Sequence, residues 1–140
     1  MPVKVELSYK INALPSYVYS AIIDKNHLKS YFVKKASSSL SRGIDLTWEF
    51  SNKEPPLNIS NITLEADTKI SFDWDANPWN THVEINIWEV EKGSCYIRIN
   101  EKFFTREKDN FHYALIQTQH WAEFVSSLKA YLYAGIDLRK

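Results

Sequence analysis

The sequence predicts an α+β domain in which a curved antiparallel sheet of about six to seven strands wraps around a long C-terminal helix, with two short helices after the first strand. Residues 111–140 carry an uninterrupted helical pattern, whereas most stretches upstream alternate apolar and polar residues with a period of two. The connections between consecutive strands are short, which favours antiparallel pairing. With 140 residues and 44% hydrophobic content, we expect a single domain over residues 1–140.

Composition disfavours several classes of partner. Lys plus Arg equals Asp plus Glu, 17 each, so no basic excess attracts nucleic acid or an anionic membrane. No apolar run is long enough to span a membrane, and the N-terminal residues do not resemble a signal peptide, so we expect a cytoplasmic protein. Cys95 stands alone, which excludes an internal disulfide and a thiolate zinc cage and favours a buried thiol in a strand.

The N-terminal elements follow from alternation and capping signals. Residues 3–11 alternate apolar and polar side chains, as a strand with one wet face does. Pro15 is suited to the first turn of a short helix, and Asp24 is suited to the N-cap of a second one. Tyr31 and Phe32 fall on the inner side of that second helix.

The middle of the chain reads as strands and turns. Residues 36–41 form a weak or edge strand, and residues 44–50 alternate cleanly. We expect residues 51–56 to form a loop because they contain two adjacent prolines. Residues 57–66 change phase halfway, which predicts a bulge near Ser60 and Asn61, and residues 70–74 form the next strand.

The last hairpin can be placed in register. With residues 91–93 as a bulged loop and Gly93 in the left-handed conformation, paired residues have numbers that sum to 184. Six residues then share the inner face: Val83, Ile85, Ile87, Ile97, Ile99 and Glu101. Trp88 and Tyr96 pair on the outer face, either as a surface pair or as a contact in a homodimer.

The C-terminal helix is expected from residue 111 to residue 134, and Gly135 provides the stop. Its apolar stripe recurs at steps of three or four residues: Ala114, Thr118, Trp121, Val125, Leu128 and Leu132. The apolar face of the sheet is too large for two short helices, so this helix must cover it. A straight helix against a curved sheet commonly leaves an internal cavity.

The C-terminal residues resemble a known family. Residues 120–132 read HWAEFVSSLKAYL and residues 135–140 read GIDLRK, which is similar to the ending of the START-like (SRPBCC) branch named after the activator of heat-shock-protein-90 ATPase homologue. The opening Ile11-Asn12-Ala13 with Pro15 and Tyr19 resembles the opening of the same branch. His120 departs from the branch pattern, which has glycine before the tryptophan.

This resemblance implies a helix-grip fold with a hydrophobic cavity between sheet and helix. Family members bind lipids, hormones, polyketides or other apolar molecules, and a minority are enzymes without a shared catalytic motif. No cofactor is implied.

The cavity is expected to be lined by residues on the inner phase of the strands and helices and by one loop tryptophan. These are Tyr31, Trp48, Phe72, Trp74, Trp79, Ile85, Ile99, Glu101, Thr118, Trp121 and Val125. Ordinary core packing is the competing interpretation of the aromatic residues. Glu101 is the acidic residue on the inner face, where it would act as a general acid or base, hold a ligand's polar end, or lie solvated at the rim. Thr118 and Gln117 would contact a ligand, although a threonine often bonds its own helix.

The four histidines are too scattered to form a metal motif, and the three glycines form no phosphate loop. Three functions remain open. The first is a non-enzymatic carrier of a small apolar molecule, lipid-like or polyketide-like. The second, which only the name of the resembled branch suggests, is an interaction module that assists a chaperone. The third is a cyclase, dehydratase or hydrolase built around Glu101.

Overall fold

A seven-stranded antiparallel sheet and a long helix dominate the computed structural model, which describes residues 3–51, 53–76, 80–104 and 107–140. The sheet order is β1-β7-β6-β5-β4-β3-β2, and every neighbouring pair is antiparallel. The strands are β1 (Lys4–Ile11), β2 (Lys35–Ala36), β3 (Leu46–Phe50), β4 (Lys53–Glu65), β5 (Lys69–Trp74), β6 (Thr81–Glu91) and β7 (Ser94–Phe103). The predicted helix-grip arrangement is confirmed.

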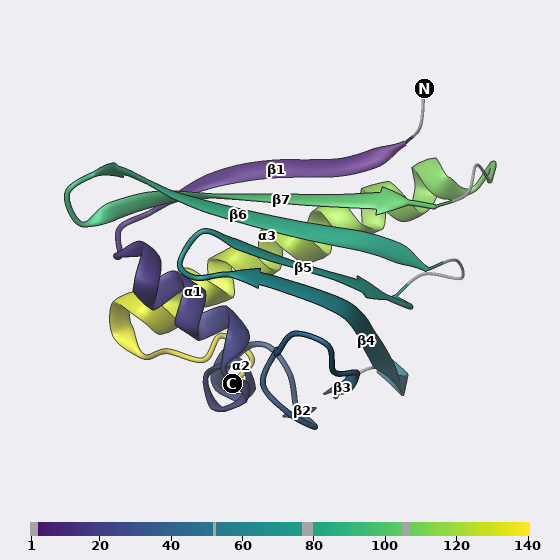
Figure 1. The fold of residues 1–140 in the computed structure, drawn as a ribbon, viewed down its shortest axis with the longest axis horizontal. Helices are drawn as coiled ribbons and strands as arrows, with labels where there is room; N and C mark the ends of the chain where they lie inside the picture. The colour runs from purple at the N-terminus through teal and green to yellow at the C-terminus, as the bar shows by residue number, and fades with distance from the viewer. Residues whose placement is uncertain (1–2, 52, 77–79, 105–106) are drawn as a thin grey trace.

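Three helices complete the part of the fold that the structure describes. Helices α1 (Pro15–Ile23) and α2 (Lys25–Tyr31) follow β1, and α3 (Asn110–Ala134) runs across the inner face of the sheet. Figure 1 shows α1 and α2 at one end of the sheet, beside the C-terminal end of α3. Within the described residues, no helix is long and apolar enough to cross a membrane.

The helix boundaries have local causes. Pro15 lies in the first turn of α1, where its missing N–H is not needed. The Asp24 carboxylate accepts hydrogen bonds from the backbone N–H groups of Asn26 (2.7 Å) and His27 (3.4 Å), which confirms the predicted N-cap of α2. At the end of α3, Gly135 adopts φ 67°, a left-handed conformation that glycine reaches without strain.

The β6–β7 hairpin has the predicted register. Pairs from Thr81 with Phe103 to Glu89 with Cys95 follow the predicted rule, and Gly93 has φ +83°. The strands extend one pair further than expected, because Glu91 pairs with Ser94 after a register shift.

The prediction of a loop over residues 51–56 is wrong. Strand β4 begins at Lys53 and includes both prolines. Phe50 pairs with Lys53 and Trp48 pairs with Leu57, so the prolines lie where the register shifts and the missing N–H groups are not required. The bulge predicted near Ser60 and Asn61 is present, because the register of β4 against β5 shifts between Ser60 and Thr63. Of the strand predicted over residues 36–41, only Ala36 belongs to a strand, because β2 is limited to Lys35 and Ala36.

The buried face of α3 differs from the predicted stripe at one turn. Gln117 is buried, whereas Thr118 is exposed and its hydroxyl donates to the Ala114 carbonyl oxygen at 2.7 Å. The buried positions of α3 are Asn110, Ala114, Gln117, Trp121, Phe124, Val125 and Leu128. A polar amide therefore faces the sheet, which requires partners there.

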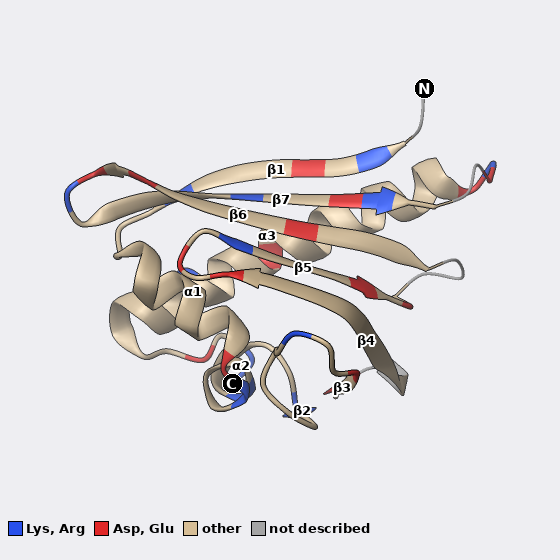
Figure 2. Ribbon diagram, viewed as in Figure 1, with Lys and Arg blue, Asp and Glu red and all other residues tan. Residues whose placement is uncertain are grey.

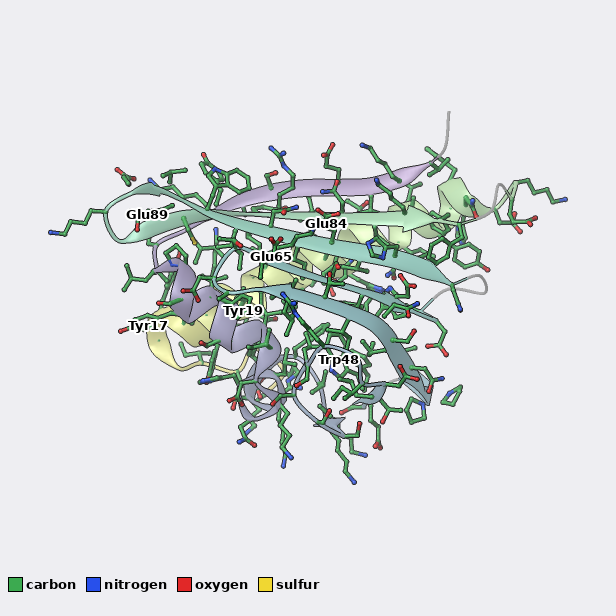
Figure 3. The ribbon with its side chains drawn as sticks, viewed as in Figure 1. Tyr17, Tyr19, Trp48, Glu65, Glu84 and Glu89 are labelled. Atoms are coloured by element: carbon green, nitrogen blue, oxygen red, sulfur yellow. The ribbon has the colours of Figure 1, made fainter. Side chains whose placement is uncertain are left out.

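Surface charges of both signs are spread over the strands and loops (Figure 2). Glu84 and Glu89 belong to β6, and Tyr17 projects from α1 with 62% of its surface exposed (Figure 3).

Trp88 and Tyr96 stack on the outer face with ring centroids 5.8 Å apart, and the Arg98 guanidinium lies 5.2 Å from the Trp88 ring centroid. The outer face therefore carries the predicted cross-strand aromatic pair.

Candidate functional site: an aromatic pocket above a buried carboxylate

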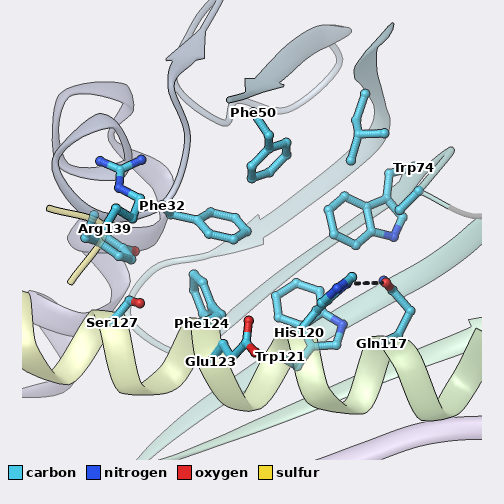
Figure 4. A pocket seen from close by; sticks show the side chains of 13 residues that line it. Phe32, Phe50, Trp74, Gln117, His120, Trp121, Glu123, Phe124, Ser127 and Arg139 are labelled. Atoms are coloured by element: carbon cyan, nitrogen blue, oxygen red, sulfur yellow. Dashed lines mark hydrogen bonds between the residues drawn. The ribbon is translucent and has the colours of Figure 1, made fainter. Parts of the chain in front are cut away.

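A pocket of about 530 Å³ lies between α3, α2 and the strands β3 to β5. Six aromatic residues contribute to its walls: Tyr31, Phe32, Phe50, Trp74, Trp121 and Phe124. Five polar or charged residues border it: Gln117, His120, Glu123, Ser127 and Arg139. Figure 4 shows the α3 side chains on one side of this space and Phe32, Phe50 and Trp74 on the other.

The aromatic walls are held by ring contacts between different elements. Trp74 of β5 stacks on Trp121 of α3 with centroids 5.4 Å apart. Phe32 contacts Phe124 at 4.7 Å and Phe50 at 5.1 Å, in both cases edge to face. Such arrangements add to the stability that burial of the rings supplies. Contacts between rings of different elements thus support the walls of the pocket.

Glu101 is fully buried beneath the pocket, and four side chains of the described part of the chain donate hydrogen bonds to it. The indole N–H groups of Trp74 (2.8 Å) and Trp121 (2.9 Å) donate to it, as do the Thr81 hydroxyl (2.5 Å) and the Gln117 amide (3.0 Å). A carboxylate offers about four acceptor positions, so these donors match its full capacity. The carboxylate joins β5, β6, β7 and α3 into one polar centre.

Gln117 extends this centre to the rim of the pocket. Its amide nitrogen faces Glu101, and its amide oxygen lies 3.1 Å from His120 Nδ1. Figure 4 shows this second contact on the pocket side of α3. A continuous hydrogen-bonded path therefore runs from the buried carboxylate to a histidine at the pocket surface.

Arg139 fastens the C-terminal tail over the other end of the pocket. Its guanidinium donates to the backbone carbonyl oxygens of Val33 (3.0 Å) and Lys29 (2.8 Å) and to the Asp137 carboxylate. The hydrogen bond from Arg139 lowers the pKa of Asp137 to about 2. Because these contacts engage most of the guanidinium, its main role here is to hold the tail against α2.

Tyr31 forms the floor near α2. Its hydroxyl donates to the Ala21 carbonyl oxygen at 2.8 Å, and only 1% of the residue is exposed. Burial, and to a smaller extent the nearby Tyr131, raises the pKa of Tyr31 well above its ordinary value of 10.0. This hydroxyl is satisfied by the protein and is not free for a ligand.

The structure brings part of the predicted set of site residues together. Tyr31, Trp74 and Trp121 line the pocket, and Glu101 lies directly behind the two tryptophans. The exposed Thr118 does not line it, and Trp79 lies outside the described residues.

Five other predicted residues are buried in the core and are not part of the pocket wall: Trp48, Phe72, Ile85, Ile99 and Val125. Trp48 packs edge to face on Phe72 at 5.4 Å and on Trp74 at 6.0 Å, so its own neighbours fill the space it faces. Its buried indole N–H has no hydrogen-bond partner among the described residues. Core packing accounts for this group.

Sequence reasoning missed much of the rim. Phe50 was on the inner phase of its strand and could have been chosen from alternation alone. Phe124, one step of three from Trp121, could also have been chosen. Arg139 lies beyond the helix, and no local pattern places it beside α2. Within the described residues, no group of three or more His, Cys, Asp or Glu side chains could hold a metal ion.

Comparisons with known proteins agree with this architecture. The profile of the family described as Activator of Hsp90 ATPase homolog 1-like protein matches residues 12–133. No curated protein matches the chain.

Similar solved structures share the fold over nearly the whole chain. A crystal structure of SSP2350 from Staphylococcus saprophyticus has a TM-score of 0.82 at 23% identity and covers 98% of this chain and 96% of its own. The solution structure of the Aha1 dimer from Colwellia psychrerythraea has a TM-score of 0.79 at 20% identity, covering 95% and 98%.

A third structure is DynU16, a putative protein in the dynemicin biosynthetic locus. It has a TM-score of 0.80 at 16% identity and covers 94% of this chain and 48% of its own.

Proposed function

The chain belongs to the family of Activator of Hsp90 ATPase homolog 1-like proteins, and from that premise we propose that it binds a small, largely apolar molecule in the pocket between α3 and the sheet. The observation that carries the proposal is the space of about 530 Å³ with six aromatic residues in its walls. Ligand pockets have volumes of this order, apolar walls and a few polar groups that orient the ligand. A lipid-like or a polyketide-like molecule would suit these walls.

The pocket can be tested by blocking it. Ser127 borders the pocket, whereas Ser126 is the exposed neighbour and does not. We expect Ser127→Trp to abolish binding of the small molecule that accompanies the natively purified protein, and Ser126→Trp to retain it. Native mass spectrometry of the three proteins provides the measurement. If no ligand is recovered and no aromatic or lipid extract raises the melting temperature, the proposal fails, because a ligand at 100 times its Kd stabilises by about 2.7 kcal/mol.

A role as an interaction module that assists a chaperone is the second proposal, and it rests on the family name. The measurement is the rate of ATP hydrolysis by the chaperone with and without this protein. An unchanged rate at saturating protein would remove this proposal without affecting the pocket.

Catalysis by Glu101 is the third proposal, and the geometry weakens it. The four donors already occupy the carboxylate, so a substrate would have to displace one of them. Retained turnover in Glu101→Gln, once a substrate is known, would exclude this role.

We also propose an oligomeric state and a cellular location for the protein. A homodimer is supported by the dimeric state of the Colwellia neighbour, and sedimentation at several concentrations tests it. A cytoplasmic location is supported by the single buried thiol of Cys95, which needs no oxidising compartment, and cell fractionation tests it.

A further inference from the structure

His120 stands at the rim of the pocket at the end of a chain of hydrogen bonds that begins in the core. Gln117 Nε2 lies 3.0 Å from a Glu101 oxygen, and Gln117 Oε1 lies 3.1 Å from His120 Nδ1. Gln117 is buried with 5% of its surface exposed, whereas His120 is exposed enough to meet a ligand. The two residues are one turn apart on α3.

The chemistry of the groups decides the direction of each bond. A carboxylate accepts hydrogen bonds, so the Gln117 amide turns its NH₂ group toward Glu101. Its carbonyl oxygen must then face His120 and can only accept, so the facing ring nitrogen, Nδ1, carries the hydrogen. In the neutral ring, Nε2 is then a hydrogen-bond acceptor. The buried carboxylate thereby selects the tautomer of a histidine that it does not touch.

Among the polar groups of the rim, His120 is the acceptor whose orientation is set by a hydrogen bond from the core. The Arg139 guanidinium is engaged by Asp137 and by the carbonyl oxygens of Lys29 and Val33. The exposed Glu123 carboxylate accepts from Gln119 at 3.3 Å and keeps further acceptor positions, and the Ser127 hydroxyl can also accept. His120 Nε2 makes no hydrogen bond with the described part of the chain and borders the aromatic walls.

We propose that His120 determines the specificity of the pocket by accepting a hydrogen bond at Nε2 from an aromatic ligand that carries a donor, such as a phenolic hydroxyl group. Gln117 and Glu101 are positioning residues that hold the ring in the Nδ1–H tautomer. The inference rests on the proposed function, because it names the ligand class of the same pocket.

A pair of isosteric probes tests the specificity. 2-Naphthol carries a hydroxyl donor and 2-methylnaphthalene replaces it with a methyl group; both are measured by calorimetry in mildly alkaline buffer, where an ordinary histidine is neutral. We expect His120→Leu to reduce the preference for 2-naphthol by about three- to tenfold, the range of one net hydrogen bond. His112→Leu, an exposed histidine on the first turns of α3 outside the pocket, should leave the preference unchanged.

The outcomes separate the two proposals. Failure of both probes to bind would count against the pocket itself. Binding of both probes with a preference that His120→Leu leaves unchanged would overturn the role of His120 while the pocket stands.

The tautomer is tested without a ligand. Long-range ¹H–¹⁵N spectra of the neutral imidazole distinguish the protonated from the unprotonated nitrogen. We expect His120 to show Nδ1 protonated and Nε2 unprotonated, and Gln117→Met to lose this bias while His112 keeps its own pattern. A protonated Nε2 in the unchanged protein would overturn the inference, and this spectrum decides the matter even if Gln117→Met does not fold.

Discussion

Glu101 receives hydrogen bonds from three other elements, β5, β6 and α3, through Trp74, Thr81, Gln117 and Trp121. Buried polar groups are costly unless their partners are complete, and here each donor depends on the same carboxylate. This residue is therefore best understood as a polar joint in the apolar core, which also fixes the two tryptophans and the glutamine that face the pocket.

Replacement of Glu101 by Gln should destabilise the protein. The new NH₂ group would face a donor and leave at least one buried N–H without an acceptor, which costs about 1–3 kcal/mol. Urea unfolding at equilibrium measures the change in unfolding free energy. Glu6→Gln, at an exposed position of β1, is the matched control. Its unfolding free energy should remain within about 0.5 kcal/mol of that of the unchanged protein. Equal stability of the two variants would contradict the role assigned to Glu101.

Tyr31 should make the protein sensitive to alkali. The pKa of Tyr31 is raised in the folded state. Its contribution to the free energy of unfolding is therefore complete below the pKa of the unfolded state, near 10, and is lost as pH rises through the pKa of the folded state. We expect Tyr31→Phe to lose about 1 kcal/mol at neutral pH, from the bond to Ala21, and to show a shallower loss of stability above pH 10 than the unchanged protein.

Tyr17→Phe provides the comparison for this experiment, because Tyr17 is 62% exposed. Denaturant unfolding at a series of pH values gives the slopes. A slope above pH 10 that is the same in Tyr31→Phe as in the unchanged protein would show that Tyr31 does not carry the effect.

The tail after α3 contacts α2 through hydrogen bonds of Arg139. Gly135 turns the chain in the left-handed conformation, and Arg139 then reaches the carbonyl oxygens of Lys29 in α2 and of Val33, two residues beyond its end. A planar guanidinium can bridge two carbonyl groups and a carboxylate at once, whereas an ammonium group cannot reproduce this fork.

The substitution Arg139→Lys should therefore raise the pKa of Asp137 from about 2 toward its ordinary value of 3.8. A ¹³C titration of the carboxyl carbon measures it. The associated stability is present above about pH 3.8 and is lost as pH falls through about 2, so neutral pH is unaffected by this titration. As a control, Arg42→Lys makes the same chemical change at a distant site and should leave the pKa of Asp137 unaltered. If the pKa of Asp137 stays near 2 in Arg139→Lys, the role assigned to the Arg139 guanidinium is wrong.

In the whole molecule, the sheet brings the first strand of the chain beside the last one. Strand β1 pairs with β7, so that Lys4 lies opposite Lys102, and α3 can cover the inner face only after these strands are present. Contacts between distant parts of the sequence slow folding, because the loop between them must close first.

We expect folding of the whole chain on the millisecond-to-second timescale typical of sheets with non-local pairing. Stopped-flow refolding followed by tryptophan fluorescence provides the rate, and far-ultraviolet circular dichroism is the independent probe. Folding within microseconds by both probes would show that the β1–β7 pairing does not limit the reaction.

The periodicity of the residues is enough to predict the order of the elements, the register of the β6–β7 hairpin and the limits of α3. These features depend on residues close together in the chain: the alternation on each strand, Gly93 in the turn, and Gly135 after the helix. The same local rules placed Glu101 on the inner face and Asp24 at an N-cap.

The tertiary structure alone decided what the inner residues do. The helical periodicity of α3 allows either Gln117 or Thr118 to face the sheet. Gln117 faces it in the structure, where its amide donates to the Glu101 carboxylate on β7. The pocket likewise depends on how far α2, α3 and β3 to β5 stand apart, which is set by packing between elements and not by any one of them. For that reason the helix-grip fold could be predicted from the sequence, whereas the division of its aromatic residues between core and pocket wall could not.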